Sequence, residues 1–219
     1  MRRWIYLLFV LLLVACAPMK QRSCNEISAA ALRSILFKEI TVDDLLTWIA
    51  QTYHVPSENI RVDVIKGTFQ SITWTTEGIQ YRVYTEESVA TGAVLLYEWG
   101  LPSANQVIAC LGTPERYRAE YTLDIPGNQL GFGMLFPAQG ILASGAEFLR
   151  SRPKEPPPIK GSFRLYGFVI TQPGSGEQIL REIYCQGSAE LCERMLQKYK
   201  PWPQDWQNIV IEIDPRLHP

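Results

Sequence analysis

The chain has 219 residues, 47% of them hydrophobic, with 21 basic and 22 acidic side chains and a net charge of −1. That length and apolar content are enough to bury the core of one domain, or of two small subdomains that share a core. The balanced charge lacks the basic patch typical of a nucleic-acid-binding protein, and no long run of like charge indicates a disordered tail.

The first sixteen residues predict an export signal of the lipoprotein type. Arg2 and Arg3 precede an apolar run from Trp4 to Ala15. At about twelve residues this run is too short to span roughly 30 Å of hydrocarbon, but it is typical of a secretory signal. It ends in Leu-Val-Ala-Cys16, which resembles the bacterial lipobox, whose cysteine receives a diacylglyceryl group and becomes the mature N-terminus. The sequence therefore predicts residues 1–15 as a signal peptide and Cys16 as the lipidation site.

A lipid on Cys16 would hold the protein outside the cytoplasm, on a bacterial cell membrane or, if the host has one, on an outer membrane. Ala17 stands in place of the Asp that commonly retains lipoproteins at the inner membrane. Each buried CH₂ contributes about 0.8 kcal/mol, so two or more acyl chains anchor a protein stably where one does not. The alternatives are an ordinary cleaved signal peptide and an uncleaved anchor helix. Removal of residues 1–15 leaves 19 basic and 22 acidic side chains, a net charge of −3.

Four cysteines remain beyond the lipid site: Cys24, Cys110, Cys185 and Cys192. In an oxidising compartment they permit two disulfides in three pairings. Cys185–Cys192 is the preferred pair because it flanks a predicted turn at Gly187-Ser188, and so short a loop contributes about 2–3 kcal/mol. The alternative is that all four are buried thiols. The spacings of 86, 75 and 7 residues contain no C-x₂-C unit, so no zinc site is predicted.

The first part of the mature chain predicts a tether, then helices, then a β-meander. Residues 17–26 are predicted to form the tether, and residues 27–40 carry apolar side chains at helical spacing. Thr41 and Asp44 form a capping pattern for a helix that ends near Tyr53. Alternation then predicts four strands, at residues 60–65, 69–75, 79–83 and 93–99, with turns at Lys66-Gly67 and Glu77-Gly78.

The order of helix and meander then repeats. Ser103 predicts the cap of a helix that ends at Gly112, and strands follow at residues 117–125, 129–136, 140–149 and 162–171. The body thus spans residues 41–172, as a tandem α-β repeat of residues 41–100 and 103–172. Residues 173–219 contain a helical hairpin, at 176–185 and 189–199, and a last strand at 208–213. The fold class is α+β, an antiparallel sheet with helices on one side and a C-terminal helical hairpin.

No catalytic, cofactor-binding or metal-binding constellation is predicted. The only histidines are His54, interpreted as a capping or surface residue, and His218. A catalytic nucleophile needs a positioned base, and the sequence near His54 contains no residue that indicates a nucleophile. The adjacent carboxylates Asp43-Asp44 and Glu86-Glu87 are not placed to face one another as a pair. Gly131-Phe-Gly133 matches no phosphate-binding loop and predicts a bulge or close packing within a strand.

Aromatic residues near the C-terminus are the strongest prediction of a binding surface: Tyr199, Trp202 and Trp206. Tryptophan is enriched in binding hot spots, and these rings could stack on a sugar or a peptide. The alternative is that the three rings cover a satellite core at the chain end. Aromatic residues that alternate along the strands predict core positions or cross-strand pairs: Trp74, Tyr81, Tyr84, Tyr97 and Trp99.

Two stretches, Val107-Ile-Ala-Cys-Leu-Gly-Thr-Pro-Glu115 and Leu135-Phe-Pro-Ala-Gln-Gly-Ile-Leu142, resemble motifs of uncharacterised bacterial lipoproteins, as does Lys200-Pro-Trp-Pro203. That resemblance covers most of the mature chain and implies no activity. A helix that ends in Leu-Gly-x-Pro before a meander also resembles the SmpA/OmlA and β-lactamase-inhibitor-protein-like repeats, which implies a binding module. The first half of the chain has no Leu-Gly-x-Pro after its helix.

Two hypotheses of function follow. The first is a non-catalytic envelope lipoprotein that binds another protein, as an assembly factor or an inhibitor. The alternative is a cell-wall or glycan binder, or a hydrolase with dispersed carboxylates, that uses Trp202 and Trp206. A broad apolar or aromatic sheet face favours the first hypothesis, and a deep polar cleft with converging acids favours the second.

Overall fold

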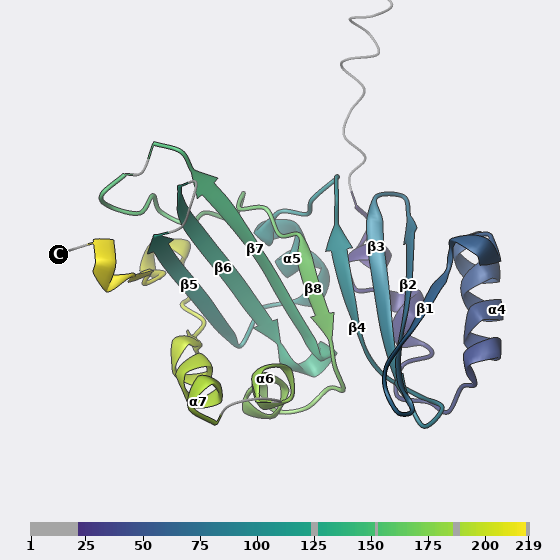
Figure 1. Cartoon of the computed structure of the whole chain (residues 1–219). Helices are drawn as coiled ribbons and strands as arrows, with labels where there is room; N and C mark the ends of the chain where they lie inside the picture. The colour runs from purple at the N-terminus through teal and green to yellow at the C-terminus, as the bar shows by residue number, and fades with distance from the viewer. Residues whose placement is uncertain (1–21, 124–126, 152, 186–188, 218–219) are drawn as a thin grey trace, which may run out of the picture.

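A single large sheet with helices packed on it forms the protein, as predicted for the α+β class (Figure 1). The computed structural model describes residues 22–123, 127–151, 153–185 and 189–217. The predicted signal peptide, Cys16 and His218 lie outside these residues. Within the described ranges, no helix combines the length and the apolar character needed to cross a bilayer.

Four strands in the first half form an antiparallel meander: β1 Arg61–Lys66, β2 Phe69–Thr76, β3 Ile79–Glu86 and β4 Val89–Tyr97. The predicted turn between β2 and β3 is present, with positive φ at Glu77 (49°) and Gly78 (71°). The predicted start of β4 at residue 93 is wrong. Glu87 and Ser88 also adopt positive φ, so they form a tight turn without glycine, and β4 begins directly after them.

Four strands in the second half form another meander: β5 Arg116–Leu123, β6 Asn128–Phe136, β7 Ile141–Leu149 and β8 Gly167–Ile170. β8 is shorter than the predicted strand at 162–171. The backbone of the preceding residues bonds elsewhere, because the Phe163 carbonyl accepts from the amide of Ala104 and the Leu165 amide donates to Pro102. β8 therefore pairs with β4 and β7 over four residues only.

The strand order is β1-β2-β3-β4-β8-β7-β6-β5-β10, so the two meanders meet through their last strands. Two short C-terminal strands close the β5 edge. β9 Lys200–Pro201 pairs antiparallel to β5, and β10 Glu212–Ile213 pairs parallel to it. At the other edge, no described segment pairs with the outer side of β1. The tandem repeat itself stays a prediction.

One face of the sheet is covered by four α-helices: α2 Cys24–Ile27, α3 Ala30–Arg33, α4 Val42–Tyr53 and α5 Ala104–Leu111. Thr41 and Ser103 cap α4 and α5 as predicted, since their side chains accept from the amides of Asp44 and Gln106. The helical pattern over 27–40 does not give one helix. Ala29 has a left-handed φ of 49°, and this separates α2 from α3. Four short 3₁₀ helices complete the chain: Ser57–Asn59, Pro137–Gln139, Trp206–Asn208 and Pro215–Leu217.

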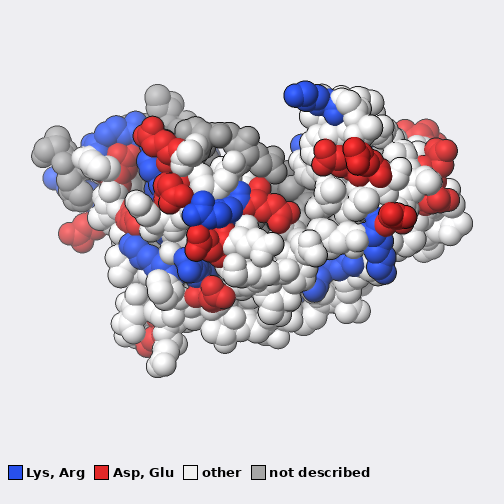
Figure 2. Space-filling view, turned by 90° about the horizontal axis from the view of Figure 1, so that it is seen from below, with Lys and Arg blue, Asp and Glu red and all other residues white. Residues whose placement is uncertain are grey.

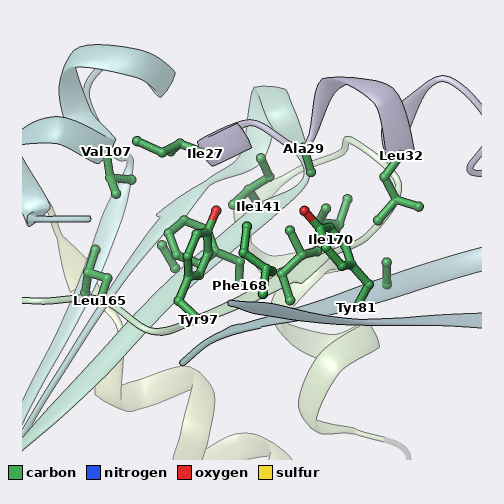
Figure 3. Close-up of a cluster of buried hydrophobic side chains, with 14 of the residues drawn as sticks. Ile27, Ala29, Leu32, Tyr81, Tyr97, Val107, Ile141, Leu165, Phe168 and Ile170 are labelled. Carbon is green, nitrogen blue, oxygen red and sulfur yellow. The ribbon is translucent and has the colours of Figure 1, made fainter. Parts of the chain in front are cut away.

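The main core lies between these helices and the sheet (Figure 3). Ile27 and Leu32 from the first two helices and Val107 from α5 pack toward the sheet side chains. Trp74 stacks on its cross-strand partner Tyr81, with ring centroids 5.1 Å apart, as the alternation predicted. Each buried aromatic of this kind adds about 0.5–1.5 kcal/mol of pair interaction beyond its area.

The C-terminal helical hairpin packs on the opposite face of the sheet. α6 Gly176–Tyr184 and α7 Ala189–Lys198 form it, and the buried Ile179 and Leu180 of α6 pack against Leu135 and Leu142. Arg181 pairs with glutamates of both helices, Glu177 at 2.9 Å and Glu193 at 3.2 Å. Figure 2, which views the lower end of the molecule, shows acidic and basic side chains interleaved around these helices.

Three tyrosines, Tyr53 of α4 and Tyr81 and Tyr97 of the sheet, predict a loss of stability in alkali. Burial raises the pKa of Tyr53 and Tyr97, and it raises that of Tyr81 to about 12. Folding thus favours the neutral phenols, and this contribution is fully present below the unfolded pKa of about 10 and is lost as the pH rises toward the folded value. We expect the free energy of unfolding, measured with urea, to fall from about pH 10 upward. Tyr81→Phe should make that fall less steep and leave the stability near neutral pH little changed.

Candidate functional site

Two neighbouring cavities flank the start of α5, and Asn105 lines both. The larger, about 780 Å³, lies where the described chain begins, between Arg22, Trp99 and Arg164. We call it the exit cavity. The smaller, about 510 Å³, is lined by Trp202 and Trp206 and is called the tryptophan cavity. Both are of the size that small ligands or peptide side chains occupy.

The tryptophan cavity is built by the segment that follows β9. The Trp202 amide donates to the carbonyl of Glu115 at 2.9 Å, which fixes this segment beside the start of β5. The rings of Trp202 and Trp206 meet edge to face, at 5.2 Å between centroids, and both contact the buried ring of Phe132. Polar groups share the lining, from Asn105, Glu115 and Gln204. The two indoles therefore cover the core and also present a mixed aromatic and polar wall.

The third predicted member of this surface lies elsewhere. Tyr199 is buried on the opposite face of the sheet, where its hydroxyl lies 3.0 Å from that of Tyr184. Its ring crosses Gly133, where an added Cβ would come within 3.6 Å of the Tyr199 hydroxyl oxygen. That distance is an ordinary van der Waals contact, so close packing does not account for Gly133, and the β5–β6 register contains no bulge there. The prediction that Tyr199, Trp202 and Trp206 form a single surface is wrong, because Tyr199 projects to the other side of the strands.

The exit cavity is organised by Arg22, which is only 5% exposed. Its guanidinium donates to the carbonyl oxygens of Glu77, Trp99 and Gly100 at 2.7, 3.0 and 3.4 Å, and to Glu26 at 3.0 Å. The same group lies 4.8 Å from the ring centroid of Trp99. The predicted tether is therefore wrong from Arg22 onward, since these residues belong to the folded body. Trp99 is 48% exposed, which corrects its predicted core position.

Two carboxylates, Glu26 beside Arg22 and Asp214 beside Arg216, have a lowered pKa because each accepts hydrogen bonds from its neighbours. Burial alone would raise the pKa of Glu26, but hydrogen bonds from Ser23 and Arg22 outweigh it and lower the pKa. Asp214, near the C-terminus, has its pKa lowered by hydrogen bonds from Arg216. In both cases the carboxylate stays ionised as part of a local pair, which suits a structural role.

The other predicted chemical residues are dispersed. His54 ends α4 in a left-handed conformation, with φ of 53°, and is exposed. Asp44 accepts from the Thr41 hydroxyl at 2.7 Å in the cap, while Glu86 and Glu87 lie at the β3–β4 turn. Among the residues that the structure describes, no three His, Cys, Asp or Glu side chains converge on a metal site.

The four cysteines form two disulfides. Cys185 pairs with Cys192 across the helical hairpin, and Cys24 pairs with Cys110, which joins α2 to α5. The Cys24–Cys110 bond attaches α2 to the helix that carries Asn105, the residue that lines both cavities. It therefore fixes the first described helix of the chain to the helix between the cavities.

No known family, curated protein or solved structure matches the chain. The resemblance to envelope lipoproteins and to binding repeats stays a prediction. Sequence reasoning missed Arg22 and Trp99 as a pair because 77 positions separate them.

Proposed function

We propose that the protein is an extracytoplasmic lipoprotein, held on a bacterial membrane through Cys16, that binds another envelope protein and does not act as an enzyme. The observation that carries this proposal is the asymmetry of the sheet. One edge is closed by β9 and β10, whereas β1 presents its outer backbone groups. An open strand edge is a surface on which a partner can add an extended segment.

The side chains of β1 support this proposal. Val64 is 67% exposed, and Ile65, the extra residue at a β-bulge between Val64 and Lys66, is 51% exposed, so two apolar side chains flank the open backbone. Natural proteins commonly shield edges with charge or with covering segments. Asp63 and Lys66 supply charge in β1, but the two apolar side chains remain available to a bound strand.

The first test is to crosslink the lipidated protein in native membranes and to identify partners against a Cys16→Ser control. Val64→Lys should then weaken the binding of that partner at least about tenfold, because a charge would replace an apolar contact at the centre of the interface. The matched control is Val210→Lys, at another exposed valine. A partner that binds Val64→Lys as tightly as the unchanged protein would contradict docking on β1.

A second candidate function is glycan binding in the tryptophan cavity. Perpendicular indoles beside Asn105, Glu115 and Gln204 offer both stacking surfaces and hydrogen-bonding groups. Trp206→Ala should weaken binding to purified cell-wall glycan about tenfold or more, while Trp48→Ala, in α4, should leave it unchanged. Unchanged glycan binding in Trp206→Ala, or none by the original protein, would count against this function.

A further inference from the structure

The described chain begins at one end of the sheet, the upper end in Figure 1. Arg22 is fixed there by its bonds to Trp99 and Gly100, just beyond the end of β4. Six positions separate Arg22 from Cys16, and an extended chain covers about 3.5 Å per residue, so a lipidated Cys16 lies within about 20 Å of this end. The nine residues of β4 extend about 26 Å, so the opposite end of the sheet is farther away by that length.

The strand register brings further exposed rings to the same end. Gly167 pairs with Leu96 of β4 and with Ser144 of β7, and these two strands run in the same direction. Trp99 lies three residues beyond Leu96, and Phe148 lies four beyond Ser144, so both extend past the start of β8 at Gly167. Phe148 is 56% exposed.

The connection between β7 and β8 presents basic groups from a fixed scaffold. From Ile159 to Tyr166, buried and exposed positions alternate. Phe163 and Leu165 point into the core, whereas Lys160, Arg164 and Tyr166 are exposed. Arg164 also donates to the carbonyl of Leu101 at 2.9 Å, next to the Gly100 carbonyl that Arg22 binds. These side chains are therefore held beside the start of the described chain.

We define the anchor-side surface as Trp99, Phe148, Lys160, Arg164 and Tyr166. Within residues 148–166, the described basic side chains are Arg150, Lys154, Lys160 and Arg164, against one acidic side chain, Glu155. Glu98 lines the exit cavity together with Trp99 and Arg164, and Glu147, next to Phe148, is exposed, so the excess of basic groups is confined to the connection between β7 and β8. Aromatic rings interleaved with basic groups suit the headgroup region of a bilayer, because the rings prefer the interface and the bases attract anionic lipids.

We infer that the anchor-side surface rests on the anionic headgroups of the same membrane that holds Cys16. This inference rests on the proposed anchoring, and it adds a direct contact between protein and lipid. The short reach of the chain keeps this end near the bilayer, and the basic connection provides charge complementarity. The open edge strand β1 runs antiparallel to β4, so it then points away from the lipid and is accessible to other envelope proteins.

The test is hydrogen exchange on the lipidated full chain in vesicles. Amides of residues 98–101 and 148–166 should exchange at least about fivefold more slowly in vesicles with phosphatidylglycerol than in phosphatidylcholine alone, since one basic group near an anionic surface has an effect of that order. High salt should remove the difference because it screens the charges. The double variant Phe148→Ser/Lys160→Glu should lose it as well.

The matched control is Val64→Ser/Lys66→Glu, which makes the same kinds of change in β1, and it should retain the protection. Equal exchange in both vesicle types would overturn the inference. Protection that appears only in native membranes would also overturn it, because the surface would then bind a membrane protein and not the lipid headgroups. Mass spectrometry of Cys16 tests the anchor separately: a lipidated protein without vesicle protection loses only this inference, whereas an unmodified Cys16 overturns both.

Discussion

Replacing Cys24 and Cys110 together by serine should lower the free energy of unfolding by about 4–5 kcal/mol, from the entropy that the bond removes from the unfolded chain. The bond closes a loop with a sequence separation of 86 residues. It also ties α2, which carries Ile27 of the core, to α5. Because small domains are stable by only roughly 5–15 kcal/mol, this is a large share of the total. Urea unfolding, followed by far-UV circular dichroism, measures the change.

The second disulfide provides the comparison. Cys185 and Cys192 have a sequence separation of 7, so their replacement by serine should cost only about 2–3 kcal/mol in the same treatment. The bond is local to the hairpin of α6 and α7. An equal or larger loss for this pair would contradict the argument from loop length, and it would point instead to the contacts of the hairpin with Leu135 and Leu142.

Arg22→Met should destabilise the protein by about 3 kcal/mol, because it removes a buried charge-assisted donor from three backbone carbonyls at once. Methionine retains much of the side-chain volume, so the loss reports the guanidinium more than a cavity. Arg22→Lys should recover only part of the stability, since an ammonium group lacks the planar fork that reaches carbonyls of separate turns. Thermal and urea unfolding both test the order of these variants.

Glu26→Gln is the control for the Arg22 network. It removes the ionised partner of Arg22 but keeps a hydrogen-bond acceptor, and the Glu26 side chain is partly exposed, so the expected loss is below about 1 kcal/mol. Because the pKa of Glu26 is lowered on folding, its contribution is present above the unfolded value of about 4.3 and is lost as the pH falls through the folded value. A loss in Glu26→Gln as large as in Arg22→Met would show that the ion pair, and not the carbonyl contacts, dominates.

Much of the fold could be predicted from local signals. The cap at Thr41, the turn at Glu77-Gly78 and the strand alternation around Tyr81 depend on residues close in sequence. The errors lie where distant contacts override those signals. Ala29 interrupts a helical pattern, and Phe163 gives its carbonyl to Ala104 instead of to a strand neighbour. Neither feature can be predicted from the spacing of apolar residues in the sequence.

The candidate site was predictable only in part, for the same reason. Trp202 and Trp206 are near in sequence and share a cavity, as their spacing indicated. Tyr199 is equally near but faces the other side, because β9 lies between them and successive strand residues alternate in direction. Arg22 gave no sequence signal, since its partners become neighbours only when β3 and β4 are in place.

The position of β8 sets the order in which the chain completes its fold. β4 ends at Tyr97, but its neighbour on the inner side begins only at Gly167, so the first meander is formed long before that edge is paired. The parallel pairing at the β5 edge likewise requires Glu212 and Ile213, which lie near the end of the chain. Pairings of such long sequence separation slow folding. Besides β1, a growing chain therefore exposes the β4 edge until β8 emerges and the β5 edge until the C-terminal strands emerge, and chains truncated before β10 should be prone to association and to proteolysis.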